Sequence, residues 1–192
     1  RRQRQMCIRD RSSLNSWGWD LDSGTGGFKA TGGVSASGIN KGLAAGDLTI
    51  NGITIGSSVA ADDTSSIGSK ESSAISKAAA INRSSALTGV TATAQATVAS
   101  GVGMTAGSAG ASGTLTINGV TTSTITLLGN TAQDRAQTVA AINAISGASG
   151  VTAVDTGSDI NGVQLTAADG RNIFAYSTTC LLYTSPSPRD QR

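Results

Sequence analysis

Histidine is absent from this chain of 192 residues, and cysteine, proline, tryptophan, tyrosine and phenylalanine occur only twice each. Imidazole is the side chain that most often acts as a base near neutral pH and as a zinc ligand, so its absence excludes histidine-dependent triads and zinc sites that need histidine. Long apolar runs are also missing, and no charged segment leads into an apolar one. We therefore expect neither a membrane span nor a secretory signal.

Small residues dominate what is present. Glycine, alanine, serine and threonine supply 103 residues, whereas leucine, isoleucine, valine and phenylalanine together supply 37. So few large apolar side chains place the chain near the limit at which burial can offset the entropy of folding. The net charge is only +2, unlike the high net charge of most disordered chains. We therefore expect a folded domain with a thin core and marginal stability.

The two ends of the chain differ in composition from the segment between them. Residues 1–11 read RRQRQMCIRDR, and the stretch from Cys180 reads CLLYTSPSPRD. Both strings resemble translated sequencing-adapter sequence, with the partner adapters in the orientation expected of one library fragment. We therefore exclude residues 1–11 and 180–192 from reasoning about the fold. The alternative for the N-terminal string is a basic arm for nucleic acid.

Excluding both ends changes the charge and the thiol count. The two segments carry seven of the fourteen Lys and Arg residues but two of the twelve Asp and Glu residues, which leaves a formal net charge of −3. Cys7, Cys180 and both prolines also lie in these segments. The remaining chain is mildly acidic and has no thiolate to act as nucleophile or metal ligand. It also lacks the basic surface that attracts phosphates, so no nucleic acid partner is expected.

Three short blocks recur in the same order along the chain. LTING is displaced by 67 positions, and Ala-Ala-Ile-Asn and Gly-Val-Thr-Ala are each displaced by 61. Such repetition predicts two copies of one supersecondary unit. The paired blocks lie within residues 47–55 and 114–122, at 79–82 and 140–143, and at 89–92 and 150–153. We name residues 46–100 the first repeat and residues 113–175 the second repeat.

The LTING block predicts a β-hairpin in each repeat. Apolar and threonine residues alternate on both sides of Asn51-Gly52 and of Asn118-Gly119. Asn and Gly tolerate the positive φ values that a two-residue type I′ turn requires. In the first repeat this turn places Ile50 opposite Ile53, with the apolar side chains on one face and the threonines on the other. Asn51, Gly52, Asn118 and Gly119 are the structural residues that we single out.

A helix should cover the apolar face of each hairpin. In the second repeat Thr131 and Asp134 have capping-box spacing, Ala136, Val139 and Ile142 recur at helical spacing, and Ser146-Gly147 supplies a stop. The equivalent segment of the first repeat contains Glu71, Ile75, Ala78 and Ile81. Two strands, at 151–154 and 163–167, should follow in the second repeat, and an extended segment at 90–98 takes their place in the first.

These elements predict an α+β fold of two tandem small units, each a hairpin followed by a helix and one or two further strands. The expected organisation runs from the adapter-like end 1–11 through a flanking segment 12–45 to the first repeat 46–100. A Gly/Ala/Ser linker at 101–112, expected to be mobile, then leads to the second repeat 113–175 and to the adapter-like end 180–192.

No catalytic, cofactor-binding or metal site emerges from the remaining motifs. Residues 155–162 carry alternating oxygen donors, but no glutamate lies at the bidentate position of a calcium loop, so a plain hairpin loop is the better interpretation. Trp17 and Trp19 could stack on a sugar or a base, yet Asp20 and Asp22 beside them would repel phosphate. No small-molecule substrate is expected either.

The order of the blocks carries a family resemblance. LTINGV, AAINAISGASGVTA and VQLTAADGRNI, preceded by FKATGG, resemble the "IN" motif of the variable, outward-facing region of bacterial flagellins and of filament-cap proteins. The resemblance covers roughly residues 28–173. It implies an extracellular structural subunit of the flagellar filament that acts in motility and is not an enzyme.

The long heptad-patterned helices of flagellin termini do not occur in this sequence. We therefore expect an internal fragment, whose contacts with other flagellin subunits would run through terminal regions absent here. A filament-cap (hook-associated) protein or a secreted adhesin built from the same motif is the alternative, and these would differ in their flanking sequences. An enzyme is a remote third class, since only a carboxylate pair could supply its chemistry.

Overall fold

The computed structural model describes residues 42–101, 106 and 108–177. The adapter-like ends, the flanking segment up to residue 41 with Trp17 and Trp19, and residues 102–105 and 107 of the expected linker lie outside the described residues. Both helices and strands occur in the described part, so the predicted α+β class is confirmed.

The first repeat is built from short elements. The hairpin β1 (Thr49–Ile50) and β2 (Ile53–Thr54) has the expected register, with Ile50 opposite Ile53. Two 3₁₀ turns follow, η1 (Ala60–Asp62) and η2 (Lys70–Ser72), and then the helices α2 (Ala74–Arg83) and α3 (Ser85–Thr88). The last element is the strand β3 (Thr97–Ala99).

The second repeat also has a hairpin followed by a pair of helices, but it contains more strands and its first helix is longer. The hairpin strands are β5 (Leu115–Ile117) and β6 (Val120–Thr121), preceded by β4 (Ser112–Gly113) and followed by β7 (Ile125–Thr126). The helices α4 (Thr131–Ala144) and α5 (Ser146–Ser149) come next. The strands β8 (Thr152–Asp155), β9 (Val163–Ala167) and β10 (Ala175–Ser177) complete it.

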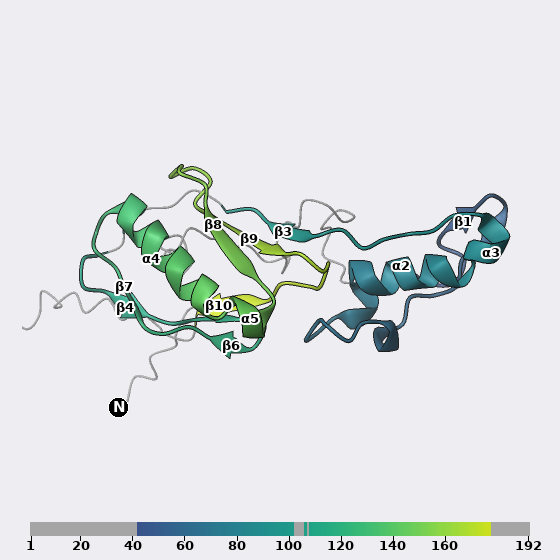
Figure 1. The fold of residues 1–192 in the computed structure, drawn as a ribbon, viewed down its shortest axis with the longest axis horizontal. Helices are drawn as coiled ribbons and strands as arrows, with labels where there is room; N and C mark the ends of the chain where they lie inside the picture. Colours follow the sequence, from purple (N-terminus) through teal and green to yellow (C-terminus); the bar gives the residue numbers. More distant parts are fainter. Residues whose placement is uncertain (1–41, 102–105, 107, 178–192) are drawn as a thin grey trace, which may run out of the picture.

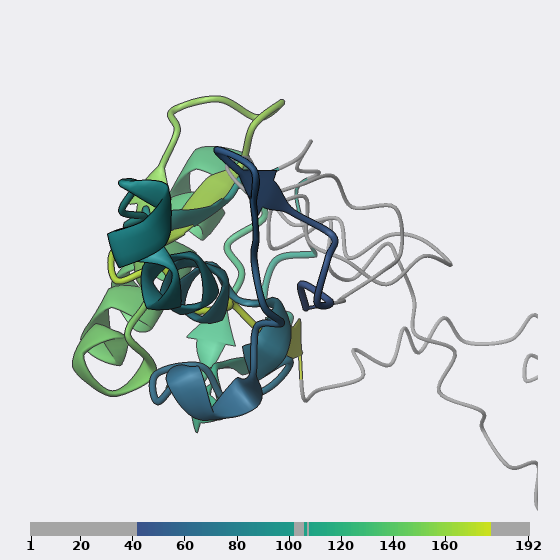
Figure 2. The ribbon, with the colours of Figure 1, turned by 90° about the vertical axis from the view of Figure 1, so that its right-hand side faces the viewer.

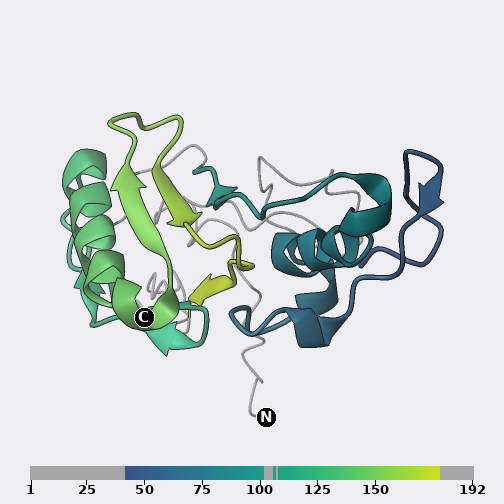
Figure 3. The same ribbon diagram turned by 45° about the vertical axis from the view of Figure 1, so that its right-hand side comes forward.

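All strand pairs among the described residues are antiparallel. The two three-stranded sheets have the orders β3-β9-β8 and β10-β5-β6, while β1-β2 and β4-β7 form two-stranded ribbons. Figure 1 shows α4 lying across β8, with α2, α3 and β1 at the other end of the molecule. Figure 3 shows the loop between β8 and β9 projecting beyond the sheet.

The apolar core lies almost entirely within the second repeat. Its side chains come from the strands and from the inner face of α4, and half-buried Val139, Ala141 and Ile145 pack against it. The core residues are Ala99, Leu115, Ile117, Ile125, Leu127, Ile142, Val151, Ala153, Val163, Leu165, Ala167, Ile173 and Ala175. In the first repeat, by contrast, the fully buried apolar side chains outside this cluster are Ile55 and Ala80.

Strand β3 crosses from the first repeat into the second. Thr97 pairs with Ala167 and Ala99 with Leu165, so β3 is the outer strand beside β9. Gly101 allows this approach, because a Cβ there would overlap the carbonyl oxygens of Asn161 and Val163. This sheet therefore contains strands from both repeats, on either side of the expected boundary at residue 100. The expected linker also ends in a strand, since Ser112 of β4 pairs with Thr126.

The helix of the second repeat differs from its prediction in three ways. Thr131 is its first residue, but Asn130 is the capping residue, and its side chain accepts a hydrogen bond from Gln133 N at 3.1 Å. Ala136, expected on the buried face, is exposed. The helix α4 ends at Ala144, beside the stop expected at Ser146-Gly147, but these two residues then begin the short helix α5, which ends at Gly150, whose φ of 71° is left-handed.

Polar residues explain the different buried face of α4. Asp134, Arg135 and Thr138 are buried together with Ile142. The Thr138 hydroxyl donates to the carbonyl of Asp134 at 2.8 Å, so its polar atom is satisfied within the helix. An apolar pattern alone could not place these residues inward. In the first repeat Glu71 precedes the helix, because Ser73 caps α2 by accepting from Ser76 N.

Candidate functional site

The two Asn-Gly turns share one backbone geometry. Asn51 and Gly52 have φ values of 50° and 81°, and Asn118 and Gly119 have 47° and 80°. Both central residues of each turn are thus in the left-handed region that a type I′ hairpin requires. Asn51 is exposed, whereas Asn118 is buried with 6% of its surface accessible.

Each turn asparagine ties its hairpin to the end of the short helix that follows. Asn51 Nδ2 donates to the carbonyl of Thr88 at 2.8 Å, and Asn118 Nδ2 donates to the carbonyl of Ser149 at 3.0 Å. Thr88 and Ser149 both precede a glycine with φ of 71°. The same bond therefore occurs in both repeats, between positions that the sequence repeat aligns.

A second pair of asparagines makes another repeated contact. Asn82 accepts from Ala92 N at 2.7 Å and donates to its carbonyl at 2.8 Å. Asn143 accepts from Ala153 N at 2.8 Å and donates to its carbonyl at 2.9 Å. Each asparagine side chain therefore holds the segment that follows its helix pair, by bonding to both the N–H and the carbonyl of one residue in that segment.

Only the second repeat adds a further clamp at its turn. The Asn118 side chain accepts from Phe174 N at 2.8 Å, and Asn118 N donates to the Phe174 carbonyl, also at 2.8 Å. The strand that follows Phe174 is β10, which pairs with β5. Asn118 thus joins three segments of the second repeat, whereas Asn51 joins two of the first.

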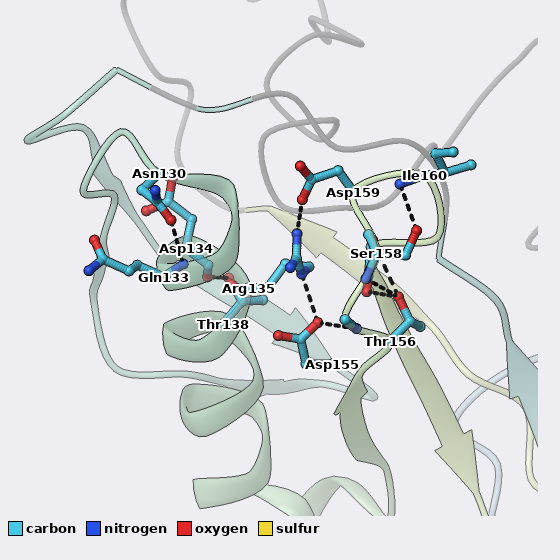
Figure 4. A network of polar contacts seen from close by, with 12 residues as sticks. Asn130, Gln133, Asp134, Arg135, Thr138, Asp155, Thr156, Ser158, Asp159 and Ile160 are labelled. Carbon is cyan, nitrogen blue, oxygen red and sulfur yellow. Dashed lines mark hydrogen bonds and ion pairs between the residues drawn. The ribbon is translucent and has the colours of Figure 1, made fainter.

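A charged cluster lies where α4 meets the loop between β8 and β9 (Figure 4). Arg135 is almost fully buried, and its Nε donates to Asp155 Oδ1 at 2.7 Å while its Nη1 pairs with Asp159. Burial alone would lower the pKa of Arg135, but the hydrogen bonds to the two carboxylates outweigh it and raise the pKa. Hydrogen bonds from Thr131 and Arg135 hold the pKa of Asp159 below its ordinary value.

The loop that carries these carboxylates is the segment 155–162, whose alternating oxygen donors resemble those of a calcium loop and whose sequence predicts a hairpin loop. It connects β8 to β9. The Asp155 carboxylate accepts from Gly157 N at 2.8 Å, and the Thr156 hydroxyl donates to the Gly162 carbonyl at 2.8 Å. Its two aspartates are engaged by the guanidinium of Arg135. Within the described ranges, no group of three or more Asp, Glu, Cys or His side chains could hold a metal ion.

A polar contact joins the loop before α2 to the segment between β9 and β10. Asn172 N donates to Ser66 Oγ at 2.8 Å, and Asn172 Nδ2 donates to the carbonyls of Gly68 at 3.1 Å and Ser69 at 2.9 Å. Figure 2 views the molecule from the end at which α2 and α3 lie. Asn172 therefore links the two repeats.

Asp63 organises the first-repeat side of this junction. Its Oδ1 accepts from Ser65 N and Ser66 N, both at 2.8 Å. Burial alone would raise the pKa of Asp63, but hydrogen bonds from the Ser66 and Ser73 side chains and from the two backbone amides lower it. The carboxylate thus holds the loop in the shape that presents Ser66 to Asn172.

The structure separates the residues that sequence reasoning found from those it missed. Asn51, Gly52, Asn118 and Gly119 form the two turns, which belong to hairpins in different sheets. Arg135 and Asn172 had no signal in apolar periodicity, because both are polar residues whose partners are distant in sequence. Asn82 and Asn143 did have one, since each ends a repeated Ala-Ala-Ile-Asn block.

Comparison with protein-family models, with curated proteins and with solved structures finds no match to this chain. No helix in the described ranges is long and apolar enough to cross a membrane.

Proposed function

We propose that the two repeats are a surface-exposed structural domain of flagellin, the extracellular subunit of the bacterial flagellar filament. The observation that carries the proposal is that the repeated asparagines form hydrogen bonds within their own repeats. The asparagines of both repeated blocks, Asn51 and Asn118 in the turns and Asn82 and Asn143 in the helices, all bond to backbone within their own repeat. Because these duplicated side chains form hydrogen bonds to the backbone of their own repeat, they support a structural role for the domain.

The last block of the second repeat, residues 163–173, also has a structural role. VQLTAADGRNI supplies β9, the turn at Gly170 with φ of 80°, and the segment whose Asn172 reaches the first repeat. Asp169 pairs with Arg171 at 2.7 Å, and the hydrogen bond from Arg171 holds the pKa of Asp169 below its ordinary value. The residues that resemble the flagellin motif are therefore the residues that shape the domain, and the proposal assigns it no reaction.

The decisive experiment is recovery of the genomic sequence on both sides of residues 12–179. The proposal expects an open reading frame that continues in both directions into helical, heptad-patterned termini. An export signal with many further repeats would contradict it and favour an adhesin, and short coiled-coil ends would favour a filament cap. A gene that reads through Arg11 or Cys180 without a break would refute the adapter interpretation.

Sedimentation of the full chain tests the expected partners. If contacts with other flagellin subunits run through terminal regions, this chain should sediment as a monomer at all accessible concentrations. Long polymers would contradict that assignment and show that this chain itself contains a polymerising surface.

A further inference from the structure

We propose that Asn51 is a site of spontaneous deamidation in the folded chain, and that Asn118, in a turn of the same geometry, is protected. Both residues precede glycine, and the neighbouring residues are nearly the same: Ile50 and Ile53 flank one turn, and Ile117 and Val120 flank the other. The two sites therefore differ in their surroundings and hardly at all in their intrinsic chemistry. This chemistry does not depend on the proposed filament role.

The reaction needs only water. The backbone nitrogen of the following glycine attacks Cγ of the asparagine side chain, a new N–Cγ bond forms, and the Cγ–Nδ2 bond breaks. The glycine N–H proton is lost and the amide departs as ammonia, which leaves a cyclic succinimide. Water then opens the ring to aspartate or isoaspartate. Glycine favours the first step because it has no Cβ to obstruct the nitrogen.

The reaction requires the asparagine side chain to leave its native partner. In the type I′ turn the backbone is fixed with positive φ at both residues, and the side-chain amide is held by a carbonyl on the short helix. Ring closure rotates the side chain toward the glycine nitrogen and breaks that bond. The rate in the folded chain is therefore the intrinsic rate multiplied by the fraction of time that the turn is open.

Asn51 has little to hold it. It is exposed, its one side-chain hydrogen bond is to the Thr88 carbonyl, and the hairpin β1-β2 is a two-stranded ribbon of two residues per strand. An isolated two-stranded hairpin is marginal in water. The nucleophile is also available, since no hydrogen bond from Gly52 N is found in the described part of the chain. The turn at Asn51 should open often.

Asn118 is restrained on every side. Its side chain donates to the Ser149 carbonyl and accepts from Phe174 N, its own N–H donates to the Phe174 carbonyl, and 6% of its surface is accessible. Its hairpin belongs to a three-stranded sheet beside the core. Two hydrogen bonds more than at Asn51, at their usual net contribution, lower the open population by about tenfold to a hundredfold.

The chain contains a third Asn-Gly pair, Asn161-Gly162, in the loop between β8 and β9. Here the nucleophile is engaged, because Gly162 N donates to the Ser158 carbonyl at 2.8 Å. Gly162 is also buried although Asn161 is exposed. This site has a different turn and different neighbours, so the comparison of Asn51 with Asn118 does not include it.

The experiment is incubation of the full chain at mildly alkaline pH, with peptide mapping by mass spectrometry over time. The conversion of amide to acid and the isoaspartate content are followed at each Asn-Gly pair separately. In the folded chain we expect Asn51 to convert at least about tenfold faster than Asn118. In concentrated guanidinium chloride, where neither turn is formed, the two rates should become equal within about a factor of two, because the flanking residues match.

Three results would overturn the proposal. The first is equal conversion at Asn51 and Asn118 in the folded chain, and the second is faster conversion at Asn118. The third is conversion of Asn51 in denaturant with none in buffer, which would show that its turn does not open. The Asn51→Ser variant provides the matched control, since it removes the reacting amide: the fast phase of ammonia release should disappear, and persistence of that phase would also contradict the assignment.

Discussion

The two repeats use the same hydrogen bonds and differ in what surrounds them. In both, the asparagine of the turn donates a hydrogen bond to a carbonyl at the end of a short helix. In both, an asparagine of the longer helix donates to the backbone of an alanine in the segment that follows. The second repeat adds a dense apolar core, a third strand beside its hairpin and a buried arginine, whereas the first has few buried apolar side chains. Local polar contacts therefore set the shape of the unit, and burial sets its stability.

The largest effect should come from the core of the second repeat. Leu165 is fully buried in β9, and truncation to alanine removes apolar contact and leaves a cavity. We expect Leu165→Ala to lower the free energy of unfolding by about 3 kcal/mol, measured by urea denaturation. Ile50→Ala, at a half-buried position of the first repeat, should cost about 1 kcal/mol or less. Equal losses would show that the first repeat contributes as much core as the second.

The buried arginine should rank next. Arg135→Ala removes a cation that two carboxylates hold, and we expect a loss of about 2 kcal/mol, because hydrogen bonds between charged groups are stronger than neutral ones. The matched control is Arg83→Ala in the first repeat, whose pair with Asp62 is at the surface and should be worth about 0.5 kcal/mol. Thermal unfolding of both variants in low and high salt measures the difference. A loss at Arg135 no greater than at Arg83 would refute the importance of burial.

The turn asparagines allow a direct comparison of the two repeats. Glycine tolerates the positive φ of both positions, so Asn→Gly removes the side chain without straining the backbone. Asn118→Gly should cost about 2 kcal/mol, since it leaves the Phe174 amide without its partner and the Ser149 carbonyl with only the longer hydrogen bond from Arg171, at 3.4 Å. Asn51→Gly should cost about 0.5 kcal/mol, because water can replace an exposed amide. The reverse order in urea denaturation would contradict the account of Asn118 as the more restrained residue.

Acid should produce the smallest effect, at the junction of the repeats. The pKa of Asp63 is lowered from its ordinary value of 3.8, so its contribution to stability is complete above that value and is lost as the pH falls through the lower pKa of the folded state. We expect the free energy of unfolding to fall through this group as the pH is lowered from about 5 to about 2. Asp63→Asn should flatten that part of the profile. An unchanged slope in the variant would assign the loss to other carboxylates.

Much of the local structure could be predicted from the sequence. The Asn-Gly pairs fixed the hairpin register because only such residues adopt the required turn, and β9 has the predicted bounds because Val163, Leu165 and Ala167 alternate with polar residues. The inward face of α4 could not be predicted in the same way. Arg135 is buried through ion pairs to Asp155 and Asp159, 20 and 24 residues along the chain, whereas Asp134 and Thr138 are buried through hydrogen bonds to nearby groups. Apolar periodicity records none of these polar contacts.

The same limit applies to the polar junction. Asn172 reaches Ser66 and Ser69 from more than a hundred residues away, and a single polar residue in a turn-rich segment gives no indication of such a partner. Asn82 and Asn143 could be recognised from the sequence as part of a repeated block, but only the fold shows that they hold the segment that follows each helix pair. The sequence repeat shows which asparagines are duplicated, and the fold shows which backbone groups they contact.

The pairing of β3 with a strand of the second repeat affects how fast this chain folds. Thr97 lies about seventy residues before its partner Ala167, so β3 pairs with β9 only when a long loop is closed. Folding rates fall as contacting residues become more distant in sequence, because the loop must be closed before the contact stabilises it. We therefore expect the pairing of β3 with β9 to follow the formation of the hairpins and helices, whose contacts are local.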